Sequence, residues 1–348
     1  PSLASEILLG EVISSPQKKI SDVYADKFLK YKELIEVDYS VNYISSSSEV
    51  KVIRDNSGIF FVHYSIEPSQ LSLDLYQDKY YANFEFYGKV SGSDGNIIYQ
   101  FEKNTPIEFN EQQAGEIKSF CLQDFFPLIE GDYHFDFLLK NTISKEFTSF
   151  ETDVSIPLEA TSLQISPLLL AYDFIKSKDA DRYKKPFQVD DIQIYFRANK
   201  TFSQGENLFL FFQVMGLDKA LEDYGTIEFK ILQNEKVKFV LQKRMNEYEN
   251  LPNIFQELLT KDLLPAEYEL KVSILDKDQK EILFKNEEFF VSPVRILPRP
   301  IVISRAVPAP KNEVSLYLLG MQYLNKKDYE NAKKCLETAF SRAPDSLE

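Results

Sequence analysis

The side chains most often used in catalysis are scarce in this chain of 348 residues. It has two histidines, His63 and His134, and no G-x-S-x-G motif. Nucleophilic catalysis needs a histidine beside a serine or cysteine, with a carboxylate to orient it. Neither histidine stands in such a motif, so we interpret both as surface or edge-strand residues. We predict no catalytic residues and no enzyme activity in this chain.

Metal and phosphate sites are also hard to assemble from this sequence. No Cys/His pair has the ligand spacing of zinc. The segment 276–281, with Glu287 further on, resembles a calcium loop, but Lys280 and Glu281 stand at its fifth and sixth positions, where the sixth should be glycine. We read this segment as a polar hairpin turn. There is no glycine-rich phosphate loop, so we expect no metal and no cofactor.

Composition excludes several classes of protein. The 40 Lys and Arg against 54 Asp and Glu give a net charge of −14, which disfavours nucleic acid as a partner. The longest apolar runs, such as 208–212, are far shorter than the ~20 residues that span a bilayer. Cys121 and Cys335 are distant in the sequence, and we interpret both as small buried hydrophobic residues, not a disulfide.

From about residue 37 to 305 the apolar side chains follow a period of two. The segments 191–197 and 268–274 alternate apolar and polar residues, as half-buried strands do. Turn signals separate such runs, for example Asp94-Gly95, which suits a tight hairpin. Short strands without long helices between them predict antiparallel sandwiches.

An internal duplication divides this β region into two units. A Pro or Gly turn precedes Tyr133 in the first unit and Tyr268 in the second, and a strand follows each tyrosine. This is typical of a tyrosine corner, in which the hydroxyl bonds back to the preceding loop. We therefore predict two tandem immunoglobulin-like antiparallel β-sandwiches, at 37–160 and 161–292. Apolar side chains at i, i+4 spacing within 1–36 predict a short helix that packs on the first of these sandwiches.

Residues 293–312 form a proline-rich strap. Five prolines and no acidic residue lie between Phe289 and Asn312. Prolines favour an extended conformation, which serves either as a linker or as a docking site for an aromatic groove. We favour a linker that lies along the second sandwich.

After the strap, at 313–348, the apolar period becomes helical. Small and large residues recur at fixed intervals: Leu316, Leu319, Gly320, Tyr323, Tyr329, Ala332, Leu336, Ala339 and Pro344. This pattern resembles the 34-residue tetratricopeptide repeat, with Leu316 in place of its first tryptophan. Gly320 and Ala332 would let two antiparallel helices approach closely, while Tyr323, Leu336 and Ala339 fill the seam. Asp328 would cap the second helix.

The resemblance implies a peptide-binding groove lined by the first helix. The groove positions would be Val314, Tyr317, Met321, Leu324 and Asn325. Repeats that clamp a terminal carboxylate use Lys and Asn there, so Tyr317 and Met321 imply an apolar ligand. One repeat cannot bury its own face. It would pack on the strap and second sandwich or, as we favour, continue into further repeats.

Two segments of the β region, 165–171 and 202–214 with the later Tyr268 turn, resemble exported bacterial proteins of the GWxTD-domain type and their tetratricopeptide-containing relatives. The resemblance covers about 1–305, although a chain without tryptophan lacks the naming motif. It implies a periplasmic or secreted protein, while 1–36 contains no signal segment.

These observations favour a non-catalytic scaffold whose repeat binds a protein partner or a second copy of the chain. One alternative is a β-sandwich that binds carbohydrate or another small ligand through exposed aromatics among its 48 Tyr and Phe residues. Another is the non-catalytic part of a larger enzyme.

Overall fold

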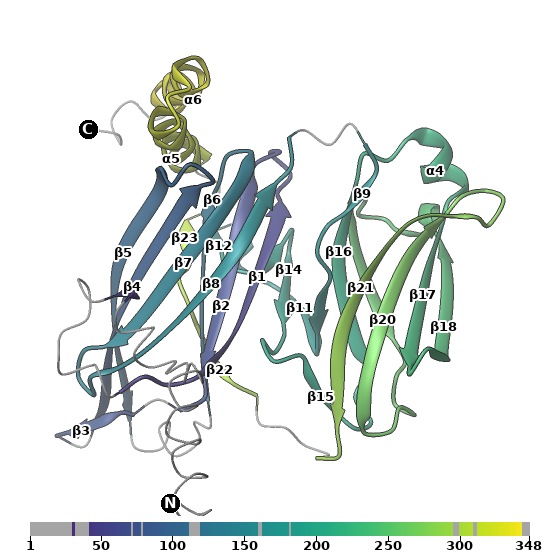
Figure 1. The fold of residues 1–348 in the computed structure, drawn as a ribbon, viewed down its shortest axis with the longest axis horizontal. Helices are drawn as coiled ribbons and strands as arrows, with labels where there is room; N and C mark the ends of the chain where they lie inside the picture. Colours follow the sequence, from purple (N-terminus) through teal and green to yellow (C-terminus); the bar gives the residue numbers. More distant parts are fainter. Residues whose placement is uncertain are drawn as a thin grey trace, which may run out of the picture.

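The chain folds into two β-sandwiches, side by side, and a helical hairpin at one end of the first (Figure 1). The computed structural model describes residues 30–31, 42–70, 72–77, 79–110, 119–158, 162–180, 182–294, 299–308 and 312–342. The predicted mainly β fold with a C-terminal helical hairpin is confirmed. Within those ranges, no helix combines the length and apolar character needed to cross a bilayer.

The first sandwich has two sheets. One contains β1 (Ser46–Arg54), β2 (Phe60–Pro68) and β6 (Phe120–Pro127), and the other contains β3 (Asp74–Tyr76), β4 (Lys79–Gly92), β5 (Ile97–Asn110), β7 (Gly131–Asn141) and β8 (Glu146–Ile156). Their facing aromatic and aliphatic side chains form one core. The ring of Phe101 on β5 lies over Gly88 on β4, where an added Cβ would be 2.2 Å from the ring. Only glycine fits at this position.

The second sandwich repeats this plan. One sheet contains β9 (Gln164–Ile165), β10 (Leu169–Ala171), β16 (Leu208–Met215) and β19 (Asn253–Leu258), and the other contains β15 (Thr201–Ser203), β17 (Thr226–Gln233), β18 (Lys236–Arg244), β20 (Ala266–Leu275) and β21 (Glu281–Ser292). Two short helices, α4 (Lys219–Tyr224) and η3 (Met245–Glu247), lie beyond the strand ends. The segment 276–280 is the polar turn between β20 and β21, as predicted: Asp276 Oδ1 accepts from the backbone N–H of Asp278 and Lys280.

The two sandwiches share one strand order. The sheet β5-β4-β7-β8 corresponds to β18-β17-β20-β21, and β1-β2-β6 corresponds to β10-β16-β19. Tyr133 on β7 and Tyr268 on β20 therefore occupy equivalent strands. The Tyr133 hydroxyl donates to the carbonyl of Glu130 at 2.7 Å, and that of Tyr268 to the carbonyl of Leu264 at 2.8 Å. These are the bonds that a tyrosine corner predicts.

A small sheet inserted into the second unit joins the two sandwiches. It contains β11 (Asp173–Lys176), β13 (Gln188–Val189) and β14 (Ile192–Tyr195), with β12 (Tyr183–Lys184) beside it. Phe187, Ile194 and Phe196 pack in one apolar cluster with Ile53 of β1. This cluster is a third core, and it lies between the units.

His63 belongs to this junction, so its interpretation as a surface or edge-strand residue is wrong. It lies on β2, which pairs with β1 on one side and β6 on the other, and it is 1% exposed. Its Nδ1 accepts a 2.8 Å hydrogen bond from the backbone N–H of Phe187, and its ring stacks on Phe125. An acceptor at Nδ1 requires the neutral imidazole. Burial and the Lys184 ammonium lower its pKa to about 3.

Buried charges also cross the junction. Lys51 Nζ lies 2.7 Å from Glu49 Oε1 and 3.7 Å from Glu287 Oε2 of the second sandwich. Lys200 of the second sandwich in turn contacts both Glu49 and Glu287. Each of these four charges has a partner in its own unit and one in the other, so the network links the two sandwiches at the junction.

We expected the strap to lie along the second sandwich, but its described part, 299–308, bridges the two units. Its strand β22 (Ile301–Ser304) pairs in parallel with β6 of the first sandwich, and β23 (Val307–Pro308) pairs with β12 (Figure 1). Where the strap crosses the junction, the Arg299 guanidinium lies 4.5 Å from the ring centre of Tyr172. The open edge of β6 offers backbone groups that need partners, which explains why the strap returns to it.

The short helix predicted within 1–36 lies largely outside the described residues. Of that segment only Lys30 and Tyr31 are described. Tyr31 packs with Leu138 and Phe147 on the outer face of the first sandwich.

Candidate interaction surface on the helical hairpin

The hairpin consists of α5 (Asn312–Asn325) and α6 (Tyr329–Arg342), which pack closely on each other. A Cβ on Gly320 would lie 2.7 Å from the Leu336 side chain. Ala332 and Ala339 on α6 are 1% and 0% exposed. These small residues let the helices approach, as the repeat pattern predicts, while Leu316 and Leu336 are half-buried.

The turn between the helices is capped as expected. Asp328 Oδ1 accepts from the backbone N–H of Asn331 at 3.2 Å, in the first turn of α6. Lys327 adopts a positive φ of 64° just before it. Pro344, predicted to close the repeat, lies outside the described residues.

One face of α5 packs on the end of the first sandwich, whereas one of the two predicted arrangements placed the repeat on the strap and second sandwich. Leu319 joins the core of the first sandwich. Gln322 is 0% exposed; its Nε2 donates to the carbonyl of Pro127 at 2.7 Å, and its Oε1 accepts from the backbone N–H of Ile129 at 3.1 Å. The Tyr323 hydroxyl donates to Glu130 Oε2 at 2.7 Å. Burial and this carboxylate raise the pKa of Tyr323.

Gln322 is therefore expected to anchor the hairpin. Gln322→Ala removes both bonds and leaves two buried backbone groups unpaired, at a cost of about 1–3 kcal/mol for each group that stays dry. We expect faster backbone hydrogen exchange in α5 and in the loop 127–129, measured by mass spectrometry. Lys333→Ala, at a lysine on the solvent side of α6, serves as the control. Equal exchange in both variants would contradict the anchoring role.

A second face of α5 remains exposed. Val314 is 48% exposed, and Tyr317 and Met321 are each 38% exposed. Leu324 is half-buried beside them. Asn325, the last predicted groove position, is also exposed and follows Met321 by one turn, and its Nδ2 donates to the carbonyl of Ile98 on β5 at 2.9 Å. We define the apolar open face as Val314, Tyr317, Met321 and Leu324.

The solvent sides of the two helices differ in chemistry. From Val314 to Asn325, α5 carries no charged side chain. On α6, which also exposes Tyr329 and Phe340, ion pairs join Lys334 to Glu330 at 2.8 Å and Lys333 to Glu337 at 3.7 Å. Charged side chains on a helix are well solvated by water. A helix face without charges that exposes large side chains is typical of a contact surface.

The remaining candidate residues take the following places. Cys121 is buried and Cys335 half-buried, and neither forms a disulfide. Burial raises the pKa of the Cys121 thiol to about 11, which makes it unreactive. His134 is half-exposed on β7, and its Nδ1 lies 2.9 Å from Asp153 Oδ1.

Sequence reasoning missed one cluster. His134, Asp136 and Glu151 bring potential metal-ligating atoms within 4.8 Å of one another. The available signal was the H-x-D spacing of His134 and Asp136, which places both on one face of a strand. Glu151 comes from the next strand, and its position depends on the register between strands.

The carbohydrate-binding alternative called for coplanar exposed tyrosines. Among the described side chains, the exposed tyrosines are Tyr183, Tyr224, Tyr317 and Tyr329. They lie on β12, α4, α5 and α6, so they do not form one platform on a sheet face.

With this geometry in place, comparison with known proteins identifies the hairpin. Residues 314–346 match the tetratricopeptide repeat family. The match does not extend to the sandwiches, so their resemblance to GWxTD-type proteins stays a prediction. No curated protein matches the chain.

Similar solved structures include two enzymes. A β-glucuronidase of Bacteroides uniformis matches at 10% identity with a TM-score of 0.23, over 39% of this chain and 15% of its own. A transglutaminase of red sea bream matches at 9% identity with a TM-score of 0.20, over 79% of this chain and 34% of its own. The chain thus spans about a third or less of these proteins, and scores this low support no conclusion about function.

Proposed function

We propose that this chain is a non-catalytic scaffold that binds a protein through the open face of α5. The two sandwiches serve as a rigid support, and the tetratricopeptide repeat presents the contact surface. The observation that carries the proposal is the uncharged, exposed open face on a helix whose opposite side is anchored by Gln322.

The chemistry of this face favours an amphipathic helical segment as the partner. Val314, Tyr317 and Met321 follow i, i+3, i+7 spacing, which matches the apolar stripe of a packing helix. Covering such a face is favourable by about 25 cal/mol for each Å² of apolar surface removed from water. Methionine and tyrosine also adapt well to a partner, the former by flexibility and the latter through its hydroxyl.

The test is the double substitution Tyr317→Glu with Met321→Glu. Both new carboxylates would have to be desolvated in the complex, so association should be lost while the fold is kept. Light scattering over a range of concentrations would measure self-association. Affinity capture, followed by titration of the purified captured protein, would measure binding of another protein.

The matched control is Lys333→Ala with Lys334→Ala on the charged side of α6, which should bind as the wild type does. Circular dichroism would confirm that both double variants stay folded. If the double glutamate variant associates as strongly as the wild type, the open face is not the contact surface and the proposal fails.

A further inference from the structure

A cluster of three ligating side chains lies on the outer face of the first sandwich, away from the hairpin's open face. His134 and Asp136 are two residues apart on β7, and Asp136 is directly opposite Glu151 on β8. His134 Nε2 lies 3.5 Å from Asp136 Oδ1 and 3.8 Å from Glu151 Oε2. These separations are long for hydrogen bonds. These two separations are close to the roughly 3.3–3.6 Å between neighbouring ligands bonded to a tetrahedral zinc ion at about 2.0–2.2 Å, and all three ligating atoms lie within 4.8 Å of one another.

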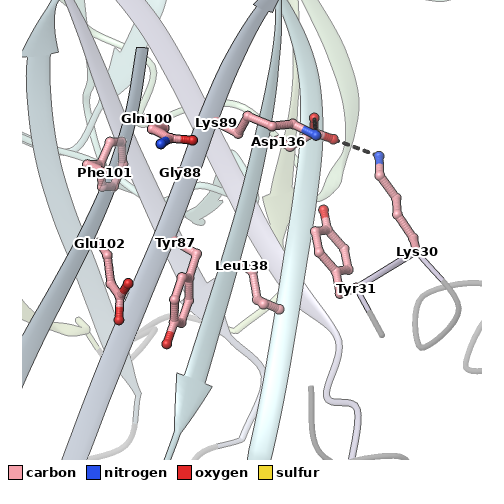
Figure 2. Close-up of a pocket in the computed structure, with 10 residues that line it drawn as sticks. All are labelled: Lys30, Tyr31, Tyr87, Gly88, Lys89, Gln100, Phe101, Glu102, Asp136 and Leu138. Atoms are coloured by element: carbon pink, nitrogen blue, oxygen red, sulfur yellow. Dashed lines mark hydrogen bonds and ion pairs between the residues drawn. The ribbon is translucent and has the colours of Figure 1, made fainter. Parts of the chain in front are cut away.

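A buried hydroxyl provides a second, independent indication of a ligand. Tyr31 is 7% exposed, and its hydroxyl lies near the Ser149 hydroxyl, with which it forms no well-ordered hydrogen bond. Figure 2 shows this hydroxyl directed along the wall of the pocket toward the carboxylate of Asp136. Burial, Asp136 and Glu151 together raise the pKa of Tyr31, so the hydroxyl stays protonated. Two neighbouring buried hydroxyls without a well-formed bond are unusual, and a water bound to a metal at the cluster would give that of Tyr31 a partner.

Lys30 already holds a positive charge at this place. Its Nζ lies 2.6 Å from Asp136 Oδ1 and 2.6 Å from Glu151 Oε2 (Figure 2 shows the first contact). Lys89 lies on the other oxygen of Asp136, at 3.2 Å. Both oxygens of Asp136 are thus paired with cations, so this corner of the sheet already concentrates positive charge beside two carboxylates.

A pocket of about 630 Å³ opens beside the cluster and is lined in part by Lys30, Tyr31 and Asp136 (Figure 2). It offers room for metal-bound water. The Lys30 side chain is 36% exposed. The pocket gives this side chain room when it moves away from the carboxylates.

We propose that His134, Asp136 and Glu151 bind a divalent transition-metal ion, with Zn²⁺ as the best fit, and that the Lys30 ammonium competes for the same carboxylates. One imidazole nitrogen with two carboxylate oxygens suits zinc, whereas Mg²⁺ and Ca²⁺ prefer oxygen ligands alone. When the metal replaces the Lys30 ammonium, its two positive charges are balanced by the carboxylates of Asp136 and Glu151. The site extends the molecule's activity beyond protein binding and does not depend on the hairpin.

The test is a calorimetric titration of the chelator-treated full chain with zinc chloride. We expect one zinc ion per chain. His134→Ala and Glu151→Gln should each weaken binding by at least about tenfold. Lys30→Met keeps the length of the side chain but removes the competing charge, so it should tighten binding by about fivefold or more. The control Glu102→Gln removes a carboxylate that lines the pocket but lies outside the ligand set, and should leave the affinity unchanged.

Imidazole signals in nuclear magnetic resonance provide an independent measurement. The chain has only two histidines, so zinc should shift the signals of His134 and leave those of buried His63 in place. The proposal is overturned if neither the wild type nor Lys30→Met binds zinc saturably, or if binding is unchanged in His134→Ala and Glu151→Gln.

Discussion

Replacing Tyr268 with alanine is expected to lower the free energy of unfolding by about 3–5 kcal/mol, since the change deletes a large aromatic side chain from a core. Tyr268 is 4% exposed and lies in the core of the second sandwich. Its ring stacks on Phe289, with 5.5 Å between the ring centres. Urea denaturation followed by circular dichroism would measure the loss.

The conservative variant Tyr268→Phe separates the hydroxyl from the ring. It removes only the bond to the carbonyl of Leu264, so we expect a loss of about 0.5–1.5 kcal/mol. Tyr329→Ala, at a tyrosine that is 68% exposed, should change the stability by less than about 0.5 kcal/mol. If Tyr268→Ala proves as mild as Tyr329→Ala, Tyr268 does not support the core.

Acidification is expected to weaken the fold through His63. Its pKa is about 3 in the folded chain, against 6.5 for an ordinary histidine. Above pH 6.5 both states are neutral and stability does not depend on this group. As the pH falls toward about 3, His63 binds a proton in the unfolded chain but stays neutral in the folded chain. The loss from this residue alone is on the order of 4–5 kcal/mol when complete.

The variant His63→Asn isolates this effect. Asparagine does not titrate, and its Oδ1 can accept the hydrogen bond from the backbone N–H of Phe187. The wild type should lose about 2 kcal/mol more than the variant between pH 6.5 and about pH 5. Urea denaturation at each pH would measure both proteins, and the contributions of carboxylates cancel in the difference. Parallel pH profiles would show that His63 does not titrate on unfolding.

Local patterns in the sequence predicted the features that depend on neighbouring residues. The turn followed by Tyr133 or Tyr268 marked both tyrosine corners, because the hydroxyl reaches only a few residues back. Gly320 and Ala332 marked the helical seam, because small residues are needed where backbones approach. Asp276 marked a turn, because its carboxylate caps the amides just after it.

Contacts between distant segments could not be predicted in this way. The period of two on β2 shows that His63 shares a face with its alternate neighbours, but it does not reveal that Phe187 of the inserted sheet covers that face. The extended form of the strap was evident from its prolines, but its partner, the edge of β6, depends on the strand order. The meeting of Asp136 with Glu151 depends on strand register, which no single segment encodes.

The return of the strap to the first sandwich has a consequence for how the chain matures. While the protein is being synthesised, β6 emerges long before β22, so the edge of its sheet stays open until the entire second sandwich has followed. An open edge can pair with the edge of another nascent chain. Strand β22, near the end of the β region, therefore covers the edge of β6 in the first sandwich. A chain that stopped between Ser292 and Ile301 would leave this edge unpaired and free to pair with another chain.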